Sequence, residues 1–146
     1  MYILVSRCLL GEPCRYDGQS RPVSELQQLI GAGHVLIPIC PETAGGLPTP
    51  RPPAERQTDG RVVNEAGEDV THAYRKGAEL AAALARKYGC EAAVLKAKSP
   101  SCGSGAIYDG TFSRRLISGW GVAAETLRAL GLTVVDEESW RTLLNS

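Results

Sequence analysis

The chain has 146 residues, of which 43% are hydrophobic and 22% charged, with 16 basic and 16 acidic side chains. This composition predicts one globular domain spanning residues 1–146, because it is neither as polar as a disordered chain nor as apolar as a membrane protein. The zero net charge does not favour extended nucleic-acid binding, and the lack of a signal peptide or a long apolar run predicts a cytoplasmic protein without a membrane segment.

Four short apolar runs predict buried strands at residues 2–6, 35–39, 92–96 and 132–136. Each run lacks polar alternation, as expected when helices cover both faces of a parallel sheet. The order of strands and helices predicts an α/β, Rossmann-like fold with a mostly parallel sheet of about four strands and flanking helices. The predicted helices cover residues 24–30, 71–88, a segment from Gly121 to just before Gly131, and 137–144.

The stretch between Cys40 and Thr71 is rich in proline and glycine. Its prolines predict an insertion without a helix and with little sheet. Only residues 61–63 and 68–70, around a turn at 64–67, have the pattern of a small β-hairpin.

Three of the five cysteines, Cys8, Cys40 and Cys102, each follow a predicted strand. The carboxyl ends of parallel strands meet at one edge of a sheet, where open α/β folds bind their ligands. Thiolates that meet there in a reducing compartment predict a soft metal ion or an iron–sulfur cluster. An odd number of cysteines does not indicate a disulfide framework.

The other two cysteines are placed differently. Cys90 precedes the third predicted strand, so we expect a buried apolar residue at the opposite end of the sheet. Cys14 shares the first loop with Cys8, and its spacing leaves open a fourth ligand, a neighbour of the ligands or a packed thiol. Structural zinc sites usually contain closely spaced ligand pairs, which this chain lacks, so the spacing disfavours zinc.

Polar residues beside the cysteines are candidates for catalysis. If three thiolates bind a cubane cluster, one iron lacks a protein ligand and can act as a Lewis acid. Glu42 lies two residues after the second predicted ligand and is a candidate general acid or base; its alternative role is pairing with an arginine. Ser101 is a candidate for orienting substrate or water, in competition with Ser99 and Ser104, and its alternative role is turn formation.

A series of ungapped motifs runs along the chain: Cys8-Leu9-Leu10-Gly11, Cys14-Arg15-Tyr16-Asp17-Gly18, Cys40-Pro41-Glu42, Gly45-Gly46-Leu47-Pro48-Thr49-Pro50-Arg51, Leu95-Lys96-Ala97-Lys98-Ser99-Pro100-Ser101-Cys102-Gly103 and Tyr108-Asp109-Gly110-Thr111-Phe112. In this order the motifs resemble those of the thiouracil desulfidase family, and the resemblance covers nearly the whole chain. It implies an enzyme that replaces the thiocarbonyl sulfur of a thiolated pyrimidine by oxygen without net redox change.

The resemblance also implies roles for individual residues. It implies that Cys8, Cys40 and Cys102 bind a 4Fe–4S cluster with one iron that the protein does not ligate. It implies that Glu42 is the acid/base residue and that Ser101 is its polar partner.

Three positions stand apart from these implied roles. Cys14 matches a family cysteine to which no ligand role is assigned here. Arg7 replaces the small residue usual before the first ligand, and Trp120 replaces an acidic residue between two glycines. Residues 119–124 match G-x-G-x-x-A, but because no strand is predicted before them they indicate a helix start.

Two other classes of function remain open from the residues alone. A cluster-carrying electron-transfer or assembly protein requires a closed cluster with a fourth protein ligand, for which Cys14 is available. A structural zinc-thiolate domain requires a colourless, zinc-loaded protein. For the desulfidase, we expect a small-molecule substrate, with Arg15, Arg51, Lys96 and Lys98 as candidate contacts to its base oxygens.

Overall fold

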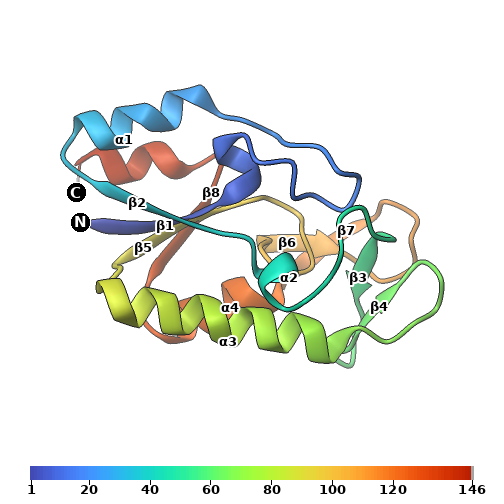
Figure 1. Cartoon of the computed structure of the whole chain (residues 1–146). Helices are drawn as coiled ribbons and strands as arrows, with labels where there is room; N and C mark the ends of the chain where they lie inside the picture. The colour runs from blue at the N-terminus through green and yellow to red at the C-terminus, as the bar shows by residue number, and fades with distance from the viewer. Residues whose placement is uncertain (146) are drawn as a thin grey trace.

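The computed structural model describes residues 1–145, which form a mixed α/β fold around a four-stranded parallel sheet (Figure 1). The strand order is β2-β1-β5-β8, so the first strand is central and neighbours both the second and the fifth. The four strands predicted from the sequence are confirmed: β1 (Tyr2–Ser6), β2 (Val35–Ile39), β5 (Ala92–Leu95) and β8 (Thr133–Asp136).

Helices cover both faces of this sheet (Figure 1). One face carries α1 (Gln27–Gly31), which follows the 3-10 turn η2 (Ser24–Leu26), together with the C-terminal 3-10 helix η3 (Trp140–Asn145). The other face carries α3 (Thr71–Tyr88), with the bounds that the sequence predicts, and α4 (Val122–Ala129).

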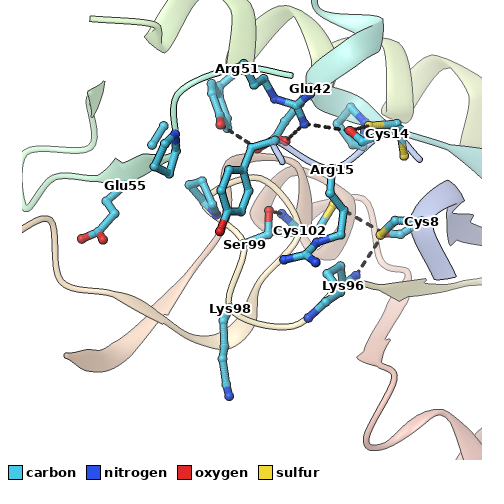
Figure 2. Close-up of a pocket in the computed structure, with 18 of the residues that line it drawn as sticks. Cys8, Cys14, Arg15, Glu42, Arg51, Glu55, Lys96, Lys98, Ser99 and Cys102 are labelled. Atoms are coloured by element: carbon cyan, nitrogen blue, oxygen red, sulfur yellow. Dashed lines mark hydrogen bonds and ion pairs between the residues drawn. The ribbon is translucent and has the colours of Figure 1, made fainter. Parts of the chain in front are cut away.

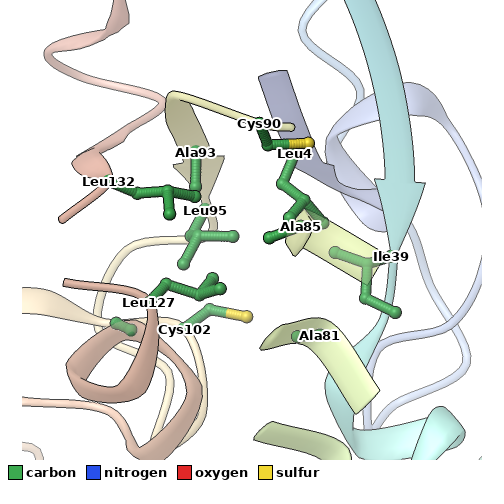
Figure 3. Close-up of a cluster of buried hydrophobic side chains, with 11 residues drawn as sticks. Leu4, Ile39, Ala81, Ala85, Cys90, Ala93, Leu95, Cys102, Leu127 and Leu132 are labelled. Atoms are coloured by element: carbon green, nitrogen blue, oxygen red, sulfur yellow. The ribbon is translucent and has the colours of Figure 1, made fainter. Parts of the chain in front are cut away.

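Alternate side chains of β1 point to the two faces and explain both layers. Ile3 and Val5 belong to a buried cluster with Leu29 and Trp140 under α1 and η3. Leu4 belongs to the opposite cluster, which packs against α3 and α4 (Figure 3). The members of that second cluster include Ala81, Ala85, Ala93, Leu95 and Leu127, and its small alanines allow α3 to lie close to the sheet.

A short helix, α2 (Pro41–Ala44), begins directly after β2, which contradicts the prediction that the insertion contains no helix. Proline is tolerated at the first helical position because its missing N–H would be unpaired there in any case. The helix rests on α3 at two glycines. A Cβ atom on Gly77 would collide with the carbonyl of Pro41, and one on Gly45 would collide with the carbonyl of Ala73.

The hairpin predicted within the insertion forms only in part, because its first strand pairs mainly with an earlier segment. Strand β4 (Val62–Asn64) pairs in antiparallel fashion with β3 (Ala54–Arg56), a proline-free segment for which the sequence predicts no strand. The predicted turn at 64–67 is present, and beside it a single antiparallel bridge between Val63 and Asp69 joins the two predicted segments. The deciding turn lies earlier, where Gly60 adopts φ 91° and Asp59 accepts a hydrogen bond from the N–H of Arg61.

A second hairpin, β6 (Ser104–Tyr108) paired with β7 (Leu116–Trp120), is not predicted by the sequence, because glycines interrupt both strands and the side chains of β7 are largely exposed. Gly119 and Trp120 are the last residues of β7, so a strand does precede the helix start at Gly121, contrary to the prediction.

The helix predicted at 137–144 is instead the 3-10 helix η3, which begins at Trp140. The carboxylate of Asp136 accepts hydrogen bonds from the Glu138 N–H and the Ser139 hydroxyl, which hold residues 136–139 in a turn. Within residues 1–145, no helix has the length and apolar character needed to cross a membrane.

Candidate functional site

The carboxyl ends of β1, β2 and β5 open into a cavity of about 460 Å³ (Figure 2). Its walls come from the loops after these strands, from α2 and from the tip of the β6–β7 hairpin. Its lining includes the thiol and carboxylate residues considered from the sequence: Cys8, Cys14, Cys40, Cys102 and Glu42. It also includes the four basic candidates and Ser99.

Local structure explains how each cysteine reaches this cavity. Cys8 lies in a 3-10 turn, η1 (Arg7–Leu10), immediately after β1, and Cys40 is the residue that precedes α2. Cys102 lies in a turn after β5 that is fixed by Ser99, whose Oγ accepts hydrogen bonds from the N–H groups of Ser101 and Cys102, both at 3.1 Å. All three predicted ligands are buried.

The thiol of Cys102 is held by a buried serine. Ser6 Oγ donates to Cys102 Sγ at 3.5 Å and accepts a hydrogen bond from the backbone N–H of Lys96 at 3.0 Å. Burial raises the pKa of Cys102 to about 12, an effect that the Ser6 hydrogen bond opposes and the negative charge of Glu42 reinforces. Without a metal this thiol is therefore protonated at neutral pH, and metal binding must release its proton.

Cys14 and Cys40 are direct neighbours. The Sγ atom of Cys40 lies 3.9 Å from the carbonyl oxygen of Cys14. A hydrogen bond with Cys14 and burial raise the pKa of Cys40. The pKa of Cys14 is also raised: the hydrogen bond with Cys40 lowers it, but that with Cys8 and burial outweigh this effect. Cys90, by contrast, is buried in the core cluster of Figure 3 and does not line the cavity.

The cysteines around the cavity fit a soft inorganic centre. Their spacing lacks the close ligand pairs that are usual in structural zinc sites. Four cysteines around one cavity instead offer soft ligands to a larger inorganic centre, as iron–sulfur clusters require.

Glu42 projects from α2 and is held by two other side chains (Figure 2). The hydroxyl of Tyr74 donates to Oε1 of Glu42 at 2.6 Å, and Arg51 forms an ion pair with Oε2. Burial and then the charge of Glu42 raise the pKa of Tyr74, so its phenol remains a neutral donor. Burial alone would lower the pKa of Arg51, but Glu42 raises it overall.

Of the basic residues considered as substrate contacts, three have partners of their own, the first being Arg15, whose Nη1 lies 3.6 Å from Oδ2 of Asp17. Arg51 Nη2 donates to the carbonyl of Cys14 at 3.0 Å as well as pairing with Glu42. Lys96 Nζ lies 2.7 Å from Oε2 of Glu137. Tyr74 is a site residue that the sequence does not single out; the available signal is that a buried tyrosine hydroxyl needs a hydrogen-bond partner.

Ser101 is fully buried and is not among the residues lining the cavity, whereas Ser99 is. The carbonyl of Ser101 accepts hydrogen bonds from the N–H groups of Ala123 and Ala124, and Gly121 packs directly on the Ser101 backbone. Among the described residues its hydroxyl makes no hydrogen bond of normal geometry, yet it lies close enough to Cys102 to lower the pKa of that thiol.

Comparison with known proteins adds three findings. A family model described as 2-thiouracil desulfurase matches residues 3–139. A solved structure of the [4Fe-4S]-dependent thiouracil desulfidase TudS is 49% identical, covers 97% of this chain and 94% of its own, and superimposes with a TM-score of 0.91. The uncharacterized protein YbbK of Bacillus subtilis (strain 168) is 40% identical over 151 residues, which span 97% of this chain and 99% of YbbK.

Proposed function

The chain belongs to the 2-thiouracil desulfurase family, and on that premise we propose that it is an iron–sulfur-dependent desulfidase acting on thiolated pyrimidines, with residues 1–146 as one desulfidase domain. The reaction exchanges the thione sulfur for the oxygen of water, so that one C=S bond and one water molecule become one C=O bond and one molecule of hydrogen sulfide. No electrons are gained or lost. The observation that carries this proposal is the gathering of Cys8, Cys40, Cys102 and Glu42 around one cavity.

In this proposal Cys8, Cys40 and Cys102 hold a 4Fe–4S cluster, and Cys14 stands beside them without being a ligand. When bound, such a cluster supplies an iron without a protein ligand, a Lewis acid suited to a soft thione sulfur. The three thiols are buried and line one cavity, which supports a shared soft inorganic centre at this place. The hydrogen bond from Ser6 supports the thiolate form of Cys102.

Glu42 acts as the general base toward water and then transfers protons between the reacting groups. An ionised carboxylate offers about four lone-pair positions, of which Arg51 and Tyr74 occupy one on each oxygen. The carboxylate of Glu42 can therefore still accept a hydrogen bond from a water molecule. These two contacts keep the carboxylate in a fixed orientation, which general-base catalysis requires.

Ser101 is the polar partner in this account, and it acts through Cys102 rather than on the substrate. Its buried hydroxyl lies beside the Cys102 thiol and lowers the pKa of that thiol. A hydroxyl without another partner is free to donate to a sulfur of the bound centre.

The substrate is a small molecule rather than an extended nucleic acid. The cavity volume of about 460 Å³ lies within the range of small-ligand sites, and the chain carries no excess of basic residues. The five free cysteines suit a reducing compartment, so we place the enzyme in the cytoplasm.

The test is turnover of 2-thiouracil by anaerobically reconstituted protein in water labelled with oxygen-18. We expect uracil and sulfide in equal amounts and one labelled oxygen in each uracil. Glu42→Gln should keep the iron content and lose turnover, whereas Glu79→Gln, at an exposed position of α3, should behave as wild type. Unlabelled uracil, or full activity of Glu42→Gln, would refute the proposed chemistry.

A further inference from the structure

The tip of the β6–β7 hairpin is fastened by a buried carboxylate that lies outside the group around Glu42. Glu55, in β3, is only 9% exposed. Its Oε1 atom accepts hydrogen bonds from the backbone N–H of Gly110 at 2.9 Å and from that of Phe112 at 3.1 Å. One charged side chain therefore binds two backbone donors of a segment more than 50 positions away in the sequence.

The residues that follow Glu55 strengthen the same attachment. Arg56 donates to the carbonyl oxygen of Trp120 at 2.7 Å, at the far end of the hairpin. Gln57 Nε2 donates to the carbonyl oxygen of Gly110 at 3.2 Å. Three consecutive residues, two in β3 and one directly after it, thus hold the β6–β7 hairpin against the insertion.

The fastened tip has an unfavourable backbone. Phe112 and Arg114 are not glycines, yet they adopt φ values of 58° and 60°, in the left-handed region. Such conformations cost energy in residues with a side chain and persist only where the surroundings impose them. Both residues line the cavity. The bonds from Glu55 therefore maintain a strained loop at the site itself.

Resting on the proposed function, we propose that Glu55 is a positioning residue that fixes the hairpin tip so that the ring of Phe112 stacks on the pyrimidine of the substrate. Phe112 is half-buried at the cavity wall, and it is the only phenylalanine in the chain. A flat heteroaromatic ring gains binding energy from an aromatic side chain held in the correct plane. A loop free to relax its strain would lose that plane.

The first test is limited trypsin digestion of the cluster-loaded protein, because Arg114 and Arg115 place two cleavage sites in the tip. Cleavage of a native protein follows the opening equilibrium of the segment. We expect Glu55→Ala to be cut there about tenfold faster or more. Glu55→Gln retains an acceptor oxygen, so its cleavage rate should be near that of wild type. Glu79→Ala, an exposed control on α3, should be cleaved at the wild-type rate. If folded Glu55→Ala were cleaved at the wild-type rate, Glu55 would not be holding the hairpin tip in place.

The second test separates positioning from a general structural role. For 2-thiouracil, Glu55→Ala and Phe112→Ala should each raise KM about tenfold and leave kcat within about threefold. In the double variant the effects should fall well short of additive, because Glu55 acts through Phe112. Full additivity, or an unchanged KM in Phe112→Ala, would overturn the assignment.

A third measurement keeps the inference separate from the proposed function. Uracil should slow tryptic cleavage of the wild-type tip and leave that of Phe112→Ala unchanged. If wild type shows this protection but turns over no thiolated pyrimidine, the proposed reaction fails and the recognition role of Phe112 stands. If wild type desulfurises thiouracil but uracil gives no protection, the inference fails alone.

Discussion

Arg51 and Glu42 form an ion pair in which the two side chains are only 4% and 15% exposed. The same guanidinium binds the carbonyl of Cys14, so one arginine joins the proposed base to the loop that carries the first two cysteines. Arg51 comes from the proline-rich insertion, Glu42 from α2 and Cys14 from the loop after β1. The ion pair therefore closes one wall of the cavity as well as orienting the carboxylate.

Replacement of Arg51 by methionine should lower both stability and activity. It leaves a mostly buried carboxylate without its partner, which we expect to cost about 3 kcal/mol in the free energy of unfolding of the metal-free protein. The double variant Arg51→Met with Glu42→Gln should recover much of this loss, since it removes both charges. Urea unfolding measures the loss of stability in Arg51→Met and its recovery in the double variant, and a turnover assay measures the loss of activity. Equal midpoints for wild type and Arg51→Met would show that the pair is not coupled as described.

Tyr74→Phe removes only the hydroxyl that donates to Glu42 at 2.6 Å. A hydrogen bond to a charged group contributes about 1.5–3 kcal/mol, so we expect kcat to fall about tenfold or more while the iron content stays constant. Tyr88→Phe is the matched control, because Tyr88 lies on the same helix, is exposed and stacks on Tyr2. A kcat equal to that of the control would exclude a role for Tyr74 in holding the carboxylate.

Gly77→Ala should push α2 away from α3. The added Cβ atom would occupy the position of the Pro41 carbonyl, and the backbone on both sides would have to move. We expect a destabilisation of about 3 kcal/mol and loss of most activity, because Glu42 moves with α2. Gly31→Ala is the control: no atom lies within 4 Å of its added Cβ. The melting temperature and the turnover rate of the two variants test this expectation. Similar values for Gly77→Ala and Gly31→Ala would contradict the close packing of α2 on α3.

The metal-free protein should lose stability as the pH rises above 9. The pKa of the Cys102 thiol is about 12 in the folded chain against an ordinary value of 9.0, so the unfolded chain loses this proton first. The stabilisation that the protonated Cys102 thiol gives the folded chain is complete below pH 9.0 and is lost towards pH 12. The stability difference between wild type and Cys102→Ser should fall by about 1 kcal/mol from pH 8 to pH 10 in urea unfolding. A constant difference would show that burial does not hold this thiol protonated.

The sheet and the three strand-end cysteines are readable from the sequence because both depend on local patterns. Apolar runs mark β1, β2, β5 and β8, and a cysteine after a parallel strand has to emerge at the ligand-binding edge of the sheet. The 18 residues of α3 carry an amphipathic pattern long enough to fix both ends of the helix.

The remaining parts depend on contacts between segments distant in sequence. The partner of β4 is decided by a turn at Gly60 and not by the apolar pattern alone. Tyr74 meets Glu42 only because glycines bring α2 onto α3, and Glu55 reaches the hairpin tip only after both hairpins have formed. Ser101 precedes the proposed ligand Cys102 in the sequence, yet the start of α4 covers it and separates it from the cavity.

The most direct test of the account is the iron and acid-labile sulfide content of anaerobically reconstituted protein, compared across single alanine variants of the five cysteines. We predict about four iron and four sulfide per chain in wild type, Cys14→Ala and Cys90→Ala, and loss of the cluster in Cys8→Ala, Cys40→Ala and Cys102→Ala. Loss of the cluster in Cys14→Ala as well, or a colourless wild type that binds zinc, would contradict the assignment of three ligands and an open iron.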